Sequence, residues 1–395
     1  MSDINQTALS RRDFVALTAL GAIGFAMPEG ASAGETDPLL YVGTYTPAGG
    51  SQGIYAMRMS RATGALRIGG LVAEANNPSF VALSPNGRTV FAVNETGQLD
   101  GQATGGVRAF ARRRGVEALR PLSGQPTGGA DPCYVTTDHT GRFLLVANYT
   151  GGSIASFPIL HDGGIGPAAS FIQHEGRGPD PERQTSPHAH CIIPDPANRF
   201  VLVADLGADR IFAYAFDHHT GKLTPVAGGG ATAAPGAGPR HLAFHPNGHL
   251  VYVTNELDST VTAYRYDRAT AALVPLQTVP SVSEPVATRN APADIHVHPS
   301  GHFLYMSNRG HNSIAAFTID HASGKLTPLQ LASTGGDWPR NFAIDPRGEF
   351  MLVANQRSDT ITSFRIDRTS GRLTATGLSV ALASPVCLLF GPGRG

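Results

Sequence analysis

The feature that most constrains the fold is an internal repeat of about 50 residues, a length that holds four short strands with their turns. Each unit opens with a proline, continues as an apolar segment to a turn, and returns as a second apolar segment that ends in Asn or Asp. An alternating segment and a Thr/Ser-Gly-x-Leu sequence complete the unit. The segments are short, alternating or rich in Val, Ile, Phe and Tyr, which predicts β-strands. The opening proline recurs at Pro78, Pro132, Pro187, Pro239, Pro292, Pro339 and Pro385.

The two ends of the repeat are incomplete in complementary ways. Residues 385–390 are a first segment with no second segment after it, and residues 40–44 are a second segment with no first segment before it. Pairing them completes a seventh unit and removes the exposed edges that an open array would leave. We therefore predict an all-β, seven-bladed β-propeller with four-stranded blades, closed by pairing the N-terminal strands with the C-terminal strand.

The first 33 residues carry the pattern of an export signal. Arg11 and Arg12 form a twin-arginine pair, an apolar run follows over residues 16–27, and residues 31–33 (Ala-Ser-Ala) match a signal peptidase site. The apolar run is shorter than the roughly 20 residues that a membrane span requires. We predict a twin-arginine signal peptide over residues 1–33, a propeller domain over residues 34–395, and a periplasmic or secreted protein without a membrane span.

Composition excludes several classes of function. The formal net charge is zero, which gives no electrostatic basis for binding nucleic acid. Cys133, Cys191 and Cys387 are far apart in the sequence and lack the spacing of a disulfide framework or a zinc site. No Gly-x-Ser-x-Gly, P-loop or dinucleotide motif is present. We expect a monomer that uses no cofactor and binds a small molecule.

Polar residues that interrupt the repeat gather at one end of the predicted ring centre. The first two strands of each blade form a hairpin, so the start of one strand and the end of the other lie at the same mouth. Arg240, Glu256 and Arg309 each place a charge there, where an unpaired charge is unfavourable. They are either functional residues or a structural ion-pair network. The candidate site residues at this mouth are His188, His190, Arg240, His241, Glu256, Arg309, His311, Arg340 and Asn341.

Two other polar patterns favour structural interpretations. The asparagine that ends the second strand recurs in too many blades to mark one site, so we interpret it as capping turns between blades. Its positions are Asn94, Asn148, Asn255, Asn308 and Asn355. The His188-x-His190 and His296-x-His298 pairs place alternate side chains on one strand face, as metal ligands could be placed. No cluster of cysteines or carboxylates accompanies them, so we expect hydrogen-bonded neutral imidazoles and no metal site.

Several runs closely resemble the propeller-type 6-phosphogluconolactonase family, whose relatives include the fungal carboxy-cis,cis-muconate cyclases. They are residues 186–190 (Ser-Pro-His-Ala-His), 238–241 (Gly-Pro-Arg-His), 307–314 (Ser-Asn-Arg-Gly-His-Asn-Ser-Ile) and 339–342 (Pro-Arg-Asn-Phe). The likeness covers essentially the whole chain after the leader and implies a cofactor-free lactone site. It implies that the catalytic residues are His190 (or His188), Arg240, Glu256 and Arg309. The substrate-binding candidates are then His188, His241, His311, Arg340 and Asn341.

The expected reaction is hydrolysis of a sugar lactone. Arg240 and Arg309 would stabilise the charge that develops on the carbonyl oxygen, and Glu256 or His190 would take a proton from the attacking water. Two alternatives remain open: a lactone-forming reaction like that of the muconate cyclases, and a non-catalytic propeller that binds a periplasmic ligand or protein. The resemblance implies a phosphorylated cytosolic substrate for some members, whereas the leader implies a location where such a substrate is scarce.

Overall fold

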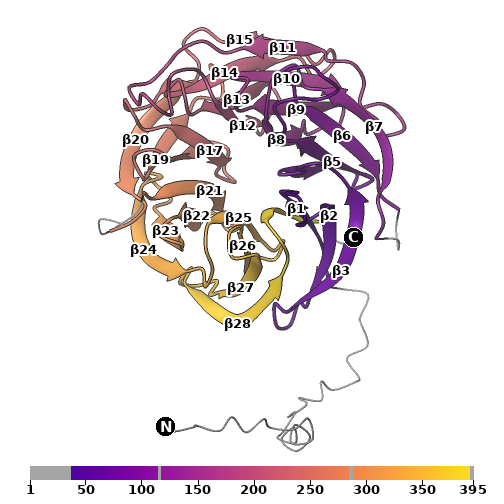
Figure 1. Cartoon of the computed structure of the whole chain (residues 1–395). Helices are drawn as coiled ribbons and strands as arrows, with labels where there is room; N and C mark the ends of the chain where they lie inside the picture. Colours follow the sequence, from indigo (N-terminus) through magenta and orange to yellow (C-terminus); the bar gives the residue numbers. More distant parts are fainter. Residues whose placement is uncertain (1–36, 114–116, 284–288, 392–395) are drawn as a thin grey trace, which may run out of the picture. The chain divides into compact units, whose positions relative to one another are not determined.

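The described part of this computed structural model comprises residues 37–113, 117–283 and 289–391. These residues contain no helix, and therefore no helix that could cross a membrane. Their strands form seven sheets around one centre, and we number these blades I to VII from the first complete one (Figure 1). The predicted signal peptide lies outside the described residues.

Within each blade the strands follow one another from the centre of the ring to its rim. From the inside outward, blade I comprises β4 (Val81–Leu83), β5 (Thr89–Asn94), β6 (Gly106–Ala111) and β7 (Arg120–Pro126). Blade II comprises β8 (Pro132–Thr137), β9 (Phe143–Asn148), β10 (Ser153–Pro158) and β11 (Ser170–Gln173). Blade III comprises β12 (Ala189–Pro194), β13 (Phe200–Asp205), β14 (Arg210–Phe216), β15 (Leu223–Pro225) and β16 (Ala231–Thr232). Blade IV comprises β17 (Pro239–Phe244), β18 (Leu250–Asn255), β19 (Thr260–Tyr266) and β20 (Leu273–Pro280). Blade V comprises β21 (Ala291–Val297), β22 (Phe303–Arg309), β23 (Ser313–Ile319) and β24 (Leu326–Ser333). Blade VI comprises β25 (Pro339–Ile344), β26 (Phe350–Asn355), β27 (Thr360–Ile366) and β28 (Leu373–Ala381). Blade VII comprises β29 (Pro385–Phe390), β1 (Leu39–Thr44), β2 (Gly53–Met59) and β3 (Leu66–Glu74).

The predicted closure is confirmed in blade VII. The last strand, β29, is the innermost strand of this blade and pairs antiparallel with β1, so that Val42 lies opposite Leu388. The prediction of four strands per blade holds for all blades except III, where the short strands β15 and β16 both pair with β14.

The hydrophobic core lies between neighbouring blades. One face of blade VII packs Leu40, Val42 and Leu388 against Phe350 and Leu352 of blade VI. Its other face packs against β4 and β5 of blade I. Burial of apolar side chains on both faces of a sheet stabilises it by about 25 cal/mol per Å² removed from water. Strands β1 and β29 are therefore held by packing on two sides as well as by their hydrogen bonds to each other.

All innermost strands except β4 carry a β-bulge near their start, and these bulges place the polar residues of the ring centre. In β12 and β25 one extra residue, His190 or Arg340, stands between positions that pair with consecutive residues of the next strand. In β17 both Arg240 and His241 lie opposite the single residue Thr254. A bulge changes the direction of the side chains beside it. Neighbouring residues of one strand can therefore contribute to the same site.

Candidate active site

A buried carboxylate, that of Glu256 just after β18, organises the candidate site. Its Oε1 accepts a hydrogen bond from Nη2 of Arg183 at 2.8 Å, and its Oε2 accepts one from Nη2 of Arg309 at 2.5 Å. Nε of Arg240 lies 2.9 Å from the same Oε2, but its N–H is not directed at that oxygen, so the contact is an ion pair. The structure thus brings together the three charged residues singled out in the sequence.

The two deepest arginines of this cluster are fixed by backbone oxygens as well as by Glu256. Nη1 of Arg240, whose side chain is 1% exposed, donates to the carbonyl of Ala293 at 2.6 Å. Nε of Arg309 donates to the carbonyl of Ala291 at 2.9 Å. These contacts do not use all five N–H donors of either guanidinium, so each can also bind an oxygen of a ligand.

The electrostatics of the cluster keep its members charged. Burial raises the pKa of the Glu256 carboxyl, but the three guanidinium groups outweigh it and hold the pKa well below its ordinary value. Burial, together with Arg309 and Arg340, lowers the pKa of Arg240 to about 9. Arg240 therefore remains a cation at neutral pH. A site with more arginines than carboxylates favours anionic ligands and developing negative charge.

Two residues of this site were not predicted from the sequence. Arg183 comes from the connection between β11 and β12, and its Nη2 also donates to the hydroxyl of Tyr149 at 3.0 Å. Trp338 directly precedes β25 with a φ of 64°, and its ring centre lies 5.4 Å from the guanidinium carbon of Arg309. The same connection also contains Arg177, and nothing in the sequence distinguishes Arg183 as the arginine that reaches Glu256. A positive φ at a bulky residue was not readable from the sequence.

A second acidic residue, Glu95, holds the predicted residue Arg340. Oε1 of Glu95 accepts a hydrogen bond from the hydroxyl of Tyr45 at 2.8 Å, and Nη2 of Arg340 lies 3.9 Å from the same oxygen. The guanidinium carbon of Arg340 lies 5.3 Å from the centre of the Tyr45 ring. Burial lowers the pKa of Arg340, but Tyr45 and Glu95 outweigh it and raise the pKa above its ordinary value. Arg340 is thus a cation held by a weak ion pair.

The two histidines of the Pro-His-x-His motif have different environments. His190 is buried, and its ring centre lies 5.1 Å from that of His241. Burial and then Arg240 lower the pKa of His190 well below its ordinary value, so its imidazole is neutral. His188 is only partly buried and stacks on Tyr149 with ring centres 4.5 Å apart. Of the two, His190 is the one that lies among the buried polar groups.

His241 and Asp294 form a buried pair beside His190. Nδ1 of His241 lies 2.9 Å from Oδ1 of Asp294. The other oxygen of this carboxylate, Oδ2, lies 3.0 Å from Nε2 of His296. Burial and Arg240 lower the pKa of His241 to about 4, although Asp294 raises it. His241 is therefore neutral at physiological pH and is oriented by a carboxylate.

Both ends of the Asn341 amide, a predicted substrate-binding group, have partners within the protein. Its Nδ2 donates to Oδ2 of Asp294 at 2.5 Å, and its Oδ1 accepts the backbone N–H of Leu388 at 2.7 Å. Because both ends of the amide have partners within the protein, Asn341 orients Asp294 and ties β25 to the closing strand. Nδ1 of the predicted residue His311 lies 2.7 Å from the hydroxyl of Ser313, the first residue of β23. Within the described part of the chain, no contact joins His311 to the Glu256 cluster.

Three of the five recurring asparagines bond to connections between blades as predicted, whereas Asn255 and Asn355 donate to threonine hydroxyls of the next strand in their own blade. Nδ2 of Asn94, Asn148 and Asn308 donates to the carbonyls of Asn76, Thr127 and Ser281, respectively, which lie in the connections between blades. These amides therefore hold one blade to the next. Among the described residues, no group of three or more His, Cys, Asp or Glu side chains is arranged to hold a metal ion.

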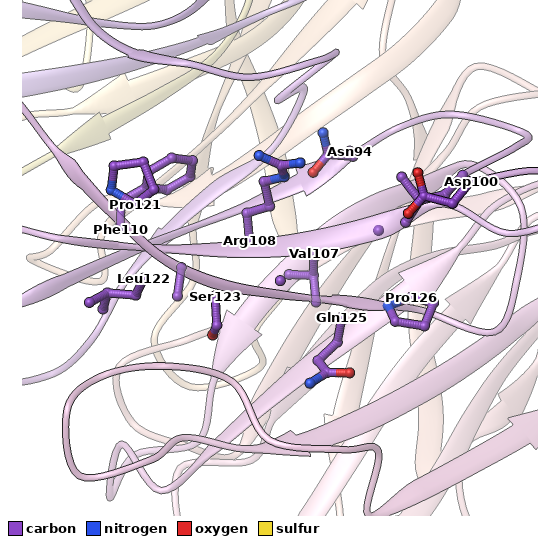
Figure 2. A pocket seen from close by; sticks show the side chains of 14 residues that line it. Asn94, Asp100, Val107, Arg108, Phe110, Pro121, Leu122, Ser123, Gln125 and Pro126 are labelled. Carbon is purple, nitrogen blue, oxygen red and sulfur yellow. The ribbon is translucent and has the colours of Figure 1, made fainter.

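A cavity of about 380 Å³ lies over β6 and β7 of blade I, apart from these groups. Figure 2 shows Arg108 beside Asn94 on one side of it, with Asp100 and Gln125 among its other labelled residues. Neither Glu256 nor any of its arginine partners lines this cavity. The candidate active site therefore lies elsewhere, at the bulged starts of the innermost strands.

Comparison with known proteins places this arrangement in a family. The model of the lactonases with a seven-bladed β-propeller matches residues 39–390. The 6-phosphogluconolactonase of Bacillus subtilis (strain 168) is 37% identical over 302 residues, which cover 76% of this chain and 83% of that protein. The 6-phosphogluconolactonase of Formosa agariphila is 34% identical over 307 residues, covering 77% of this chain and 85% of that protein.

A solved structure agrees with these sequence matches. The periplasmic gluconolactonase of Pseudomonas aeruginosa superposes with a TM-score of 0.84 at 34% identity, covering 90% of this chain and 99% of that chain. The family match, the relatives and the shared architecture extend over nearly the whole described propeller. The chain therefore belongs to the lactonase family of seven-bladed β-propellers.

Proposed function

We propose that this protein hydrolyses a sugar lactone. The observation that carries the proposal is the buried Glu256 carboxylate, which holds Arg240 and Arg309 side by side in a propeller of the lactonase family. Relatives named 6-phosphogluconolactonase and gluconolactonase support the same substrate class. The product of such a reaction is an aldonic acid, whose carboxylate suits a site with an excess of guanidinium groups.

The chemistry follows from the charges. Water attacks the carbonyl carbon of the ring ester, and negative charge develops on the carbonyl oxygen. Donors from Arg240 and Arg309 stabilise this oxygen, a contribution typically worth about 3–4 kcal/mol for one such donor. Collapse of the tetrahedral intermediate breaks the ring C–O bond, and the ring oxygen takes a proton and leaves as a hydroxyl group.

Glu256 is a positioning residue in this scheme, in contrast to one of the roles expected from the sequence. Both of its oxygens are engaged by guanidinium groups, and the pKa of its carboxyl is held well below the ordinary value. Such a carboxylate is a weak proton acceptor. The neutral imidazole of His190 is better placed to face the attacking water, because its Nδ1 has no hydrogen-bond partner among the described residues.

Export to the periplasm is the second part of the proposal. The twin-arginine pattern at Arg11 and Arg12 and the Ala-Ser-Ala sequence at residues 31–33 support it. The solved relative from Pseudomonas aeruginosa is a periplasmic gluconolactonase, which supports the same location. An exported enzyme of this kind would meet unphosphorylated lactones, so glucono-δ-lactone is the first substrate to test.

The experiment is a pH-stat assay of the purified mature protein with glucono-δ-lactone and with its 6-phosphate. We expect acid release well above spontaneous hydrolysis with at least one of them, and a large loss in Arg309→Ala. Far-ultraviolet circular dichroism and the unfolding midpoint establish whether the variant is folded. A folded wild-type protein that accelerates neither reaction would contradict the proposal.

A further inference from the structure

Two neighbouring imidazoles carry buried nitrogen atoms without a hydrogen-bond partner. Within the described part of the chain, neither Nδ1 of His190 nor Nε2 of His241 has one. The two ring centres are only 5.1 Å apart. Buried polar atoms are nearly always paired with protein, water or ligand. These two nitrogens therefore mark a place where a small polar group binds.

The structure specifies the protonation of only one of these rings. The Asp294 carboxylate can only accept, so Nδ1 of His241 carries the proton that it shares with Oδ1 at 2.9 Å. In a neutral imidazole this leaves Nε2 as a lone-pair acceptor. Nδ1 of His190 has no such partner among the described residues, so no carboxylate fixes the tautomer of this ring.

The position of His241 relates this acceptor to the proposed reaction. His241 follows Arg240 directly in the bulge of β17, where both residues lie opposite Thr254. One short segment thus supplies a guanidinium of the Glu256 cluster and an oriented imidazole. We propose that Nε2 of His241 is the proton acceptor for the attacking water, that Asp294 is its positioning residue, and that Nδ1 of His190 helps to orient the water.

This inference rests on the proposed lactone hydrolysis, and the proton balance is complete within it. The water proton passes to Nε2 of His241 as the water oxygen bonds to the carbonyl carbon. The resulting imidazolium is stabilised by Asp294 and returns the proton to the ring oxygen as the C–O bond breaks. The Asp294 carboxylate stabilises the positive charge of the imidazolium, and the Arg240 guanidinium stabilises the negative charge on the carbonyl oxygen.

The test compares His241→Asn with His296→Asn. Asparagine at position 241 keeps an N–H for Asp294 but lacks Nε2, and His296 is the matched control because it contacts the other oxygen of Asp294 at 3.0 Å. With a lactone that wild type hydrolyses, we expect His241→Asn to reduce kcat by about 10²- to 10⁴-fold with little change in KM. His296→Asn should stay within about threefold of wild type, because its loss leaves the His241–Asp294 pair intact.

A second readout does not depend on activity. In ¹⁵N NMR of the imidazoles, His241 should show a proton on Nδ1 and none on Nε2, and Asp294→Asn should change this tautomer. Equal losses of kcat in the two histidine variants, or a proton on Nε2 of His241 in wild type, would overturn the assignment. An inactive wild type contradicts the lactonase proposal itself, whereas an active wild type whose kcat survives His241→Asn contradicts only the role of His241.

Discussion

Nη2 of Arg309 donates a hydrogen bond to Oε2 of Glu256 at 2.5 Å, and both side chains are buried. The same oxygen lies 2.9 Å from Nε of Arg240. One carboxylate thus lies against two guanidinium groups and offsets part of the repulsion between them in a medium of low dielectric constant. The arrangement favours catalysis because it fixes two cations beside each other before the substrate binds.

Replacing this carboxylate should affect both stability and activity. Glu256→Gln leaves two buried guanidinium charges without their counter-ion, and breaking a buried ion pair in this way typically lowers the free energy of unfolding by about 3–5 kcal/mol. The matched control is Glu349→Gln, which removes an exposed ion pair with Arg347 at 2.8 Å. An exposed pair contributes about 0–1 kcal/mol. Urea unfolding of both variants provides the measurement, and similar midpoints for the two would contradict the buried-pair interpretation.

The same carboxylate predicts how stability depends on pH. The folded protein holds the pKa of Glu256 below its ordinary value of 4.5, so at acidic pH the unfolded chain binds more protons. Its stabilising contribution is fully present above the unfolded pKa and is lost as the pH falls through it towards the folded pKa. We expect the free energy of unfolding to fall in wild type below about pH 5, and to fall less steeply in Glu256→Gln. Parallel curves for the two proteins would contradict this.

Much of the fold could be predicted because it depends on patterns that repeat along the chain. The orphan segments at residues 40–44 and 385–390 were sufficient to predict the β1–β29 pairing. The bulge at Arg240 and His241 could not be predicted, because it depends on the local register between β17 and β18. The division of the outer strand of blade III into β15 and β16 is likewise a local feature.

The candidate site was predictable where a residue interrupts the repeat and unpredictable where it comes from a connection. Arg240, Glu256 and Arg309 are charges at the predicted mouth of the ring centre, and the structure brings them into contact. Arg183 reaches Glu256 from a segment whose path the repeat does not determine. Asn341 illustrates another limit, since the sequence does not show that its amide bonds to Asp294 and to the backbone of Leu388.

The closing strand should be essential for stability. Leu388 in β29 is 6% exposed and packs with Leu40 and Phe350 between blades VII and VI. Truncating such a side chain typically lowers the free energy of unfolding by about 2–5 kcal/mol, so Leu388→Ala should be strongly destabilised. Leu378→Ala is the matched control, because Leu378 is 39% exposed on the outer strand β28 and its loss should change stability by about 0.5 kcal/mol or less. Thermal unfolding distinguishes the two, and equal shifts would argue against a closed ring held by β29.

Export should depend on the paired arginines of the leader. Replacing both Arg11 and Arg12 by lysine keeps the charge but removes the twin-arginine pattern. We expect the altered precursor to remain in the cytoplasm while the wild type reaches the periplasm, as measured by fractionation and immunoblotting. Arg368→Lys is the matched control, since Arg368 has a side chain that is 67% exposed in the propeller. Periplasmic accumulation of the double variant would contradict the proposed route.

Arg183 should act mainly on substrate affinity. Its side chain is 28% exposed, compared with 1% for Arg240, and it is held by the side chains of Glu256 and Tyr149 without a backbone anchor among the described residues. A guanidinium held in this way can turn towards an anionic group of the ligand while Arg240 and Arg309 keep Glu256 neutralised. We expect Arg183→Ala to reduce kcat/KM by about 10- to 100-fold, mostly through KM, because hydrogen bonds to charged groups contribute about 1.5–3 kcal/mol.

The control for this prediction is a nearby arginine that lacks the contact with Glu256. Nη2 of Arg289 lies 3.9 Å from Oδ2 of Asp180, a residue of the connection that also contains Arg183. The side chain of Arg289 is 48% exposed. Arg289→Ala should therefore leave KM within about twofold of wild type, because an exposed pair of this length contributes little. Steady-state kinetics with glucono-δ-lactone and its 6-phosphate then show which anion Arg183 recognises. A larger KM increase for the 6-phosphate indicates the phosphate, whereas an equal increase for both indicates the ring ester or its carboxylate product. An unchanged KM in Arg183→Ala would show that Arg183 only supports Glu256.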